Sequence, residues 1–106
     1  MARYMFVVNY SPEGAKGILQ EGGTARRAAA EALINSVGAT MESFDFAFGS
    51  DDAYVVVDSP NPEAIAAASL TLAASGAVSG HTIPLLPPEQ VDEATKLSPA
   101  YRPPGG

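Results

Sequence analysis

Apolar and polar residues alternate along residues 39–58, and this period of two predicts a β-hairpin in the middle of the chain. Residues 49–52 form its turn. The partners expected across the ladder are then Phe48 with Ala53, Phe46 with Val55 and Phe44 with Val57. One face of the hairpin is wholly apolar. The other face is mixed, and its members are Met41, Ser43, Asp45, Ala47, Tyr54, Val56 and Asp58.

Two further segments have the pattern of strands. Residues 4–10 are apolar almost without interruption, which is typical of a central strand covered on both faces. Residues 77–86 form the fourth strand, and Pro84 within it favours an edge position, because proline has no N–H to donate to a ladder.

The residues between the first strand and the hairpin have features typical of helices. Ser11 is suited to an N-cap and Pro12 to the first helical position, which predicts a helix over 12–21. The glycines that follow interrupt it. Thr24 then caps a second piece over 25–37, so the first crossover is two helical pieces with a kink.

A second helical interval follows the hairpin. Asn61 is the expected cap, and an alanine-rich helix continues from it to Gly76. Residues 88–97 are expected to form a short acidic helix. We therefore place one domain at 1–97 and an extended tail at 98–106.

The order β-α-β-β-α-β predicts an α+β fold of the ferredoxin-like class, with a four-stranded antiparallel sheet and both helices on one face. Two helices leave the other face uncovered. An apolar patch of Met5, Val7, Tyr54 and Val56 would then be exposed, which soluble monomers avoid. We expect a homodimer or higher homo-oligomer in which two sheets pack face to face.

The composition of the chain limits which partners it can bind and which kinds of catalysis it can perform. The chain has 106 residues, 46% hydrophobic and 17% charged, as a globular domain does. A net charge of -6 argues against binding to nucleic acid or an anionic membrane. Without cysteine, and with one histidine, thiol catalysis and multi-histidine metal sites are excluded. We expect a cytoplasmic protein with no cofactor.

Several segments resemble GYD-domain proteins. The similarity extends along the chain in order, through 9–17, 21–27, 46–49, 74–78, 85–91 and 101–105. This resemblance implies the dimeric α+β barrel form of the ferredoxin-like fold. The wider dimeric-barrel superfamily includes cofactor-independent monooxygenases, haem enzymes and plain binding proteins. One position departs from the family: its turn typically reads Gly-x-Tyr-Asp, and here Asp51 stands where tyrosine is usual.

Two residues are candidate catalytic groups. His81 is a general base or donor near the cavity mouth, or an exposed histidine on an edge strand. Asp45 interrupts a strand, where aspartate is disfavoured. It is a cavity carboxylate acting as a base, or an edge charge that opposes aggregation.

Five more residues are candidates for ligand binding. Tyr54 is a donor to a ligand or an interface tyrosine, and Asn9 joins it or ends its strand. The apolar wall consists of Met5, Val7 and Val56. We expect a small apolar or aromatic molecule in the barrel, with monooxygenase-like chemistry as an extension by superfamily analogy. The alternative is a module for assembly without catalysis.

Overall fold

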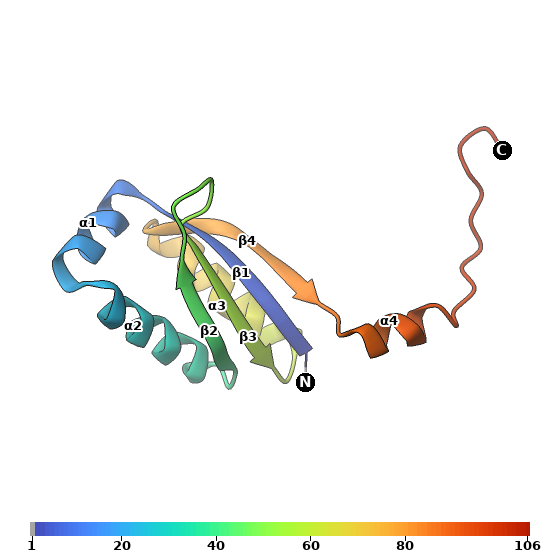
Figure 1. The fold of residues 1–106 in the computed structure, drawn as a ribbon, viewed down its shortest axis with the longest axis horizontal. Coiled ribbons are helices and arrows are strands. Elements are labelled where there is room, and N and C mark those ends of the chain that lie inside the picture. The colour runs from blue at the N-terminus through green and yellow to red at the C-terminus, as the bar shows by residue number, and fades with distance from the viewer. Residues whose placement is uncertain (1) are drawn as a thin grey trace.

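The computed structural model describes residues 2–106 and has the element order expected from the sequence (Figure 1). The elements are β1 (Ala2–Tyr10), α1 (Pro12–Glu21), α2 (Gly23–Ser36), β2 (Thr40–Phe46), β3 (Ala53–Ser59), α3 (Pro62–Ser75), β4 (Val78–Leu85) and α4 (Pro88–Ala94). The strands lie in the order β2-β3-β1-β4, and each neighbouring pair is antiparallel. The ferredoxin-like prediction is confirmed, as is the edge position of β4.

One face of the sheet carries the core. Phe6 of β1 and Val57 of β3 pack there with Ile34 of α2 and with Ile65 and Ala68 of α3. Ala68 has no exposed surface, so its small side chain lets α3 approach the sheet closely. In Figure 1, α3 lies behind the sheet and α2 runs beside β2. The opposite face has no helix over it within the described chain, and we call it the open face.

The register of the hairpin differs from the prediction by two residues. Phe46 is opposite Ala53, and Phe44 is opposite Val55. The connection is longer than four residues because Asp52 closes it, with its carbonyl accepting from the Ala47 N–H at 2.8 Å. Phe48 is fully exposed in this connection. A shift of two preserves the alternation of faces, so Phe44 and Phe46 keep the face predicted for them although their partners differ.

A β-bulge at Glu42 changes the face of one residue. The register between β2 and β3 shifts between Met41 and Ser43, which places Met41 opposite Val57. Met41 therefore packs against the core, and its predicted place on the mixed face was wrong. The extra residue, Glu42, reaches Arg3 of β1, with Nε 3.0 Å from Oε2.

The starts of α1 and α3 follow their predicted caps, and the start of α2 does not. The Ser11 hydroxyl accepts from the Gly14 N–H at 3.1 Å, and the Asn61 side chain accepts from the Ala64 N–H at 2.9 Å. Thr24 is not the cap of α2, which begins at Gly23, two residues before the predicted start, and takes Gly22 as its capping residue. Gly22 also donates to the carbonyl of Ile18, so the last turn of α1 runs directly into α2.

Beyond β4 the chain leaves the sheet and helices. Residues 86–106, which we call the arm, extend to one side of the molecule in Figure 1. Its helix α4 ends three residues before the predicted end at 97. Leu97 and Tyr101 on the arm are largely exposed. Across residues 2–106, no helix has the length and apolar character needed to cross a membrane.

Candidate functional site

One row of side chains crosses all four strands on the open face. Asp45 of β2 is opposite Tyr54 of β3, and Tyr54 is opposite Val7 of β1. Val7 is in turn opposite His81 of β4. Residues directly opposite on neighbouring strands point to the same side of a sheet. Four of the residues singled out from the sequence therefore lie in line, in the order Asp45, Tyr54, Val7, His81.

The next row toward the other end of the strands is mainly apolar. Met5 lies between Val56 on β3 and Ile83 on β4, and Ser43 ends the row on β2. Val7 is only 3% exposed because its neighbours in both rows surround it, while Met5 and Val56 are half-buried. Together the two rows make an apolar strip along the centre of the open face with polar groups at its margins.

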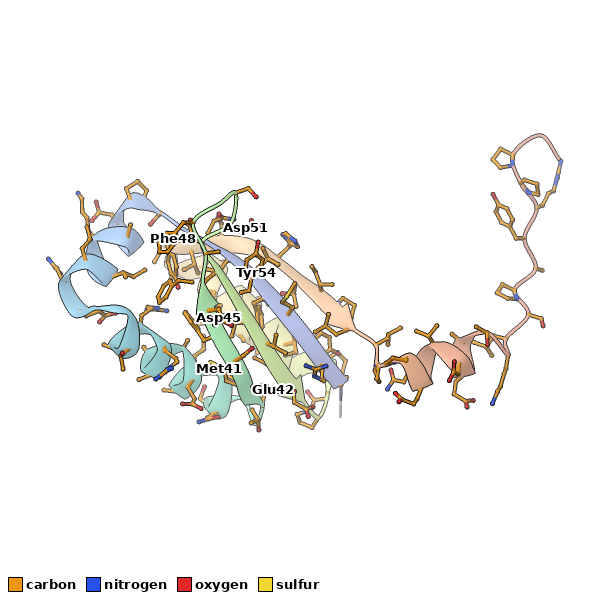
Figure 2. The ribbon with its side chains drawn as sticks, in the orientation of Figure 1. Met41, Glu42, Asp45, Phe48, Asp51 and Tyr54 are labelled. Atoms are coloured by element: carbon orange, nitrogen blue, oxygen red, sulfur yellow. The ribbon has the colours of Figure 1, made fainter. Side chains whose placement is uncertain are left out.

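A polar cluster lies at the end of this strip, where β3 begins. The Asp51 carboxylate accepts a hydrogen bond from Asn9 Nδ2 at 3.1 Å and another from the Tyr54 hydroxyl at 3.2 Å. Figure 2 shows Tyr54 and Asp51 close together at the same end of the sheet, with Asp45 and Met41 further along β2. Asn9, Asp51 and Tyr54 thus form one connected group, which we call the Asp51 cluster.

The Asp51 cluster changes the acidity of its phenol. The hydrogen bond to Asp51 raises the pKa of Tyr54 above its usual 10.0, and burial and the negative charge of Asp51 add to the rise. Tyr54 is therefore protonated at neutral pH, and its proton is directed at Asp51. Its oxygen stays able to accept a hydrogen bond from a ligand.

The adjacent Asp52 has a structural role. Its carboxylate accepts from the backbone N–H of Tyr10 at 2.9 Å, and its own N–H donates to the carbonyl of Val8 at 2.9 Å. These bonds tie the connection between β2 and β3 to the end of β1. Asp52 therefore fixes the loop that carries Asp51.

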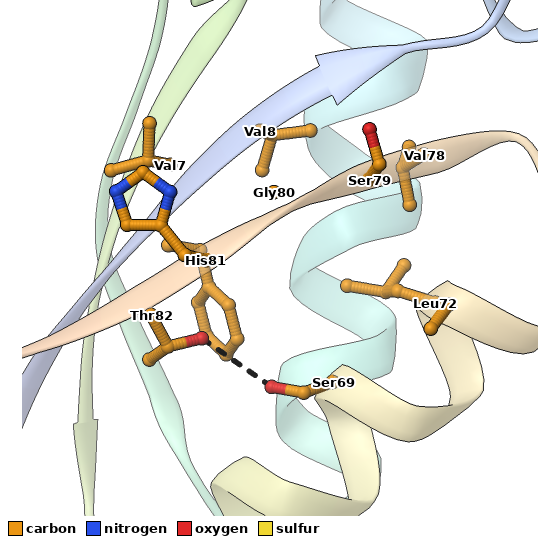
Figure 3. Close-up of a pocket in the computed structure, with 11 residues that line it drawn as sticks. Val7, Val8, Ser69, Leu72, Val78, Ser79, Gly80, His81 and Thr82 are labelled. Carbon is orange, nitrogen blue, oxygen red and sulfur yellow. Dashed lines mark hydrogen bonds between the residues drawn. The ribbon is translucent and has the colours of Figure 1, made fainter.

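The two predicted catalytic residues stand at opposite margins of the sheet. Asp45 lies on β2 and His81 on β4, and both are exposed. With β3 and β1 between them, they are separated by about 14 Å, three times the usual strand spacing. In Figure 3 the His81 ring lies beside Val7, away from the Ser69–Thr82 hydrogen bond on the other side of β4. One chain does not bring these two residues to the same atom of a ligand.

The structure places Asn9, Tyr54, Met5, Val7 and Val56 together on one face, as neighbours in a continuous surface. It adds Asp51, a residue that sequence reasoning did not select. The pattern of the chain indicates only a turn there, and the position of Asp51 in the family's turn was the signal that could have selected it. Among residues 2–106, no three His, Asp or Glu side chains gather in a group able to hold a metal ion.

The topology and the open face define a ferredoxin-like α+β domain with one uncovered sheet surface. The family model described as GYD domain matches residues 4–95, which is most of the chain. The protein therefore belongs to the GYD domain family, and the resemblance seen in the sequence is confirmed. Comparison with curated proteins and comparison with solved structures each returned no match.

Proposed function

We propose that two copies of this chain pack their open faces together and hold a small apolar or aromatic molecule between the sheets. The observation that carries the proposal is the apolar strip over Met5, Val7, Val56 and Ile83, which crosses three adjacent strands without a helix over it. Apolar surface of this kind is stabilised when it is removed from water. Membership of the GYD domain family supports the same arrangement, since the resemblance implies a dimeric barrel.

The Asp51 cluster would orient the bound molecule. Tyr54 and Asn9 are both held by Asp51, so neither has to be ordered when a ligand arrives. A ligand hydroxyl would donate to Asp51 or to the Tyr54 oxygen, while its apolar part lies against Val7 and Val56. Apolar walls with a few fixed polar groups are the usual composition of a small-molecule site.

A reaction on such a ligand would take place at an edge of the apolar strip, where the candidate proton acceptors lie. Among the residues of the open face, His81 and Asp45 are our candidates to accept a proton from an acidic C–H bond. Their separation assigns them to different ends of a ligand. Loss of activity in His81→Asn alone, or in Asp45→Asn alone, would identify which end reacts.

Native mass spectrometry of protein purified from its own source tests the proposal. We expect a dimer with an additional small mass, and loss of that mass in Val56→Glu, which places a charge in the strip. A monomer without added mass would contradict it. A dimer or larger assembly with only the mass of the protein would favour the alternative, an assembly module in which side chains fill the barrel.

A further inference from the structure

Two cavities lie on the other face of the sheet, under the helices. One cavity of about 80 Å³ lies between α3 and β4 (Figure 3), and another of about 40 Å³ lies between α2 and α3 over β1 and β3. The two cavities have common walls. These shared residues are Phe6, Val8, Leu72 and Val78. The two cavities therefore adjoin each other across a shared apolar wall, and we call the pair the groove.

The groove has polar groups near each end. Ser69 and Thr82, whose hydroxyl oxygens are 3.4 Å apart, line the α3–β4 cavity. Tyr10 and Arg26 line the cavity beside α2. Arg26 Nε is buried and has no hydrogen-bond partner in the part of the chain that the structure describes. A buried guanidinium N–H without an acceptor is unfavourable, so this atom is suited to an acceptor that arrives from outside the chain.

The groups around Arg26 favour an anion of low charge. Arg26 lies in the first turn of α2, where the helix dipole is positive. Burial raises the pKa of Tyr10, while Arg26 lowers it in part and Asp52 adds to the rise, so the phenol stays a donor at neutral pH. Asp52 is the nearby negative group, and its carboxylate already accepts from the Tyr10 backbone N–H.

We propose that this groove binds a short-chain carboxylic acid, with the carboxylate on Arg26 and Tyr10 and the apolar chain along Phe6, Val8 and Leu72. A guanidinium matches a carboxylate in geometry and in charge. One arginine and one phenol supply too few donors for a phosphate dianion. The narrow apolar walls suit a hydrocarbon chain. The proposal concerns the helix-covered face and does not depend on the dimer or on a ligand at the open face.

Isothermal titration calorimetry with sodium hexanoate tests the site. We expect wild-type protein to bind hexanoate more tightly than 1-hexanol, which has the same chain and no charge. Arg26→Gln should weaken hexanoate binding by about tenfold or more, because a charge-assisted hydrogen bond is lost, and should leave 1-hexanol unchanged. Arg27→Gln is the matched control, since Arg27 is the next residue of α2 and is exposed.

Two further variants test the apolar wall and the charge separately. Leu72→Trp fills the groove and should abolish binding of both hexanoate and 1-hexanol. Arg26→Lys keeps the positive charge, and its affinity for hexanoate should lie between that of the wild type and that of Arg26→Gln. Tyr54→Phe lies on the other face and should leave hexanoate binding unchanged. The proposal is overturned if hexanoate does not bind, if Arg26→Gln and Arg27→Gln weaken it equally, or if Tyr54→Phe removes it. The last result would move the acid to the open face.

Discussion

At the scale of single residues, Asp51 joins two strands through one carboxylate. Its oxygens accept from Asn9 of β1 and from Tyr54 of β3, so the connection before β3 is held to the sheet by side chains as well as by backbone bonds. The family usually has tyrosine at this position of the turn. In this chain Asp51 stands there, and its carboxylate accepts the hydrogen bond that the Tyr54 hydroxyl donates.

Replacing Asp51 by Asn should lower the pKa of Tyr54 toward 10.0. The raised pKa means that the folded protein holds the phenolic proton more tightly than the unfolded chain does. The stability that results is present below pH 10 and is lost as the pH rises through the folded-state pKa. Absorbance of ionised tyrosine against pH, measured on wild type and on Asp51→Asn, checks this.

The titration has a direct control. Tyr54→Phe removes one of the four tyrosines and should remove the same high-pH transition that Asp51→Asn moves. Identical curves for wild type and Asp51→Asn would show that Asp51 does not hold the Tyr54 proton.

Gly80 shows how one residue determines the approach of two strands. Its φ is +149°, and a Cβ at this position would collide with the carbonyl oxygen of Val7. Gly80→Ala should therefore lower the free energy of unfolding by at least about 2 kcal/mol. Gly17→Ala is the matched change, because nothing lies near a Cβ there in α1, and it should stabilise by about 0.5–1 kcal/mol. Equal losses in urea unfolding would contradict this account of Gly80.

At the scale of elements, β3 divides its side chains between the two faces of the sheet. Val57 has no exposed surface and lies in the core, while Val56 lies half-buried on the open face. Val57→Ala should cost about 2–3 kcal/mol, because the deleted methyl groups leave a gap under the helices. Val56→Ala should cost less at the same protein concentration. The reverse order in urea unfolding would mean that the faces are assigned wrongly.

The elements themselves were predictable, because their signals are local. Ser11, Asn61 and Gly76 mark helix ends through bonds or backbone angles formed within a few residues, and the alternation along β3 fixes its faces. The register of the hairpin was not predictable in this way. It depends on bonds from Asp52 to Ala47 and Val8, and the partner Val8 lies more than forty residues earlier in the chain.

The candidate site was predictable in part, because the alternation along a strand is a local signal. Periodicity placed Tyr54 and Val56 on one face of the hairpin. The first strand is apolar almost without interruption, so Met5 and Val7 were grouped with them only as the patch expected to be uncovered, and the ladder places all four on one face. Asp51 escaped selection because one of its partners, Asn9, lies 42 residues away in the chain, and because two adjacent acidic residues in a turn are usually solvated. The bulge at Glu42 carries no sequence signal that separates it from a regular strand, so the position of Met41 needed the structure.

At the scale of the whole molecule, the arm adds little to the sheet and its helices. Within 86–106 almost every residue is exposed, including Leu97 and Tyr101. Deleting residues 87–106 should leave the thermal unfolding midpoint of the dilute protein within a few degrees of wild type, because little apolar surface returns to water. A fall of more than about 10 °C would show that the arm is part of the folded core.

The open face has the largest consequence for the molecule. Met5 lies in its centre on β1, so a charge there should prevent two sheets from packing together. Met5→Glu should therefore be monomeric with wild-type far-ultraviolet circular dichroism. Leu70→Glu is the matched control, since Leu70 is 72% exposed on α3 and lies away from the open face. It should leave the association unchanged.

Sedimentation velocity of the wild-type chain over a dilution series tests this central claim most directly. The account predicts a species of roughly twice the 10.9 kDa chain mass at micromolar concentration, with Met5→Glu at the mass of one chain and Leu70→Glu like wild type. A wild-type protein that sediments as a single chain throughout the series would contradict it.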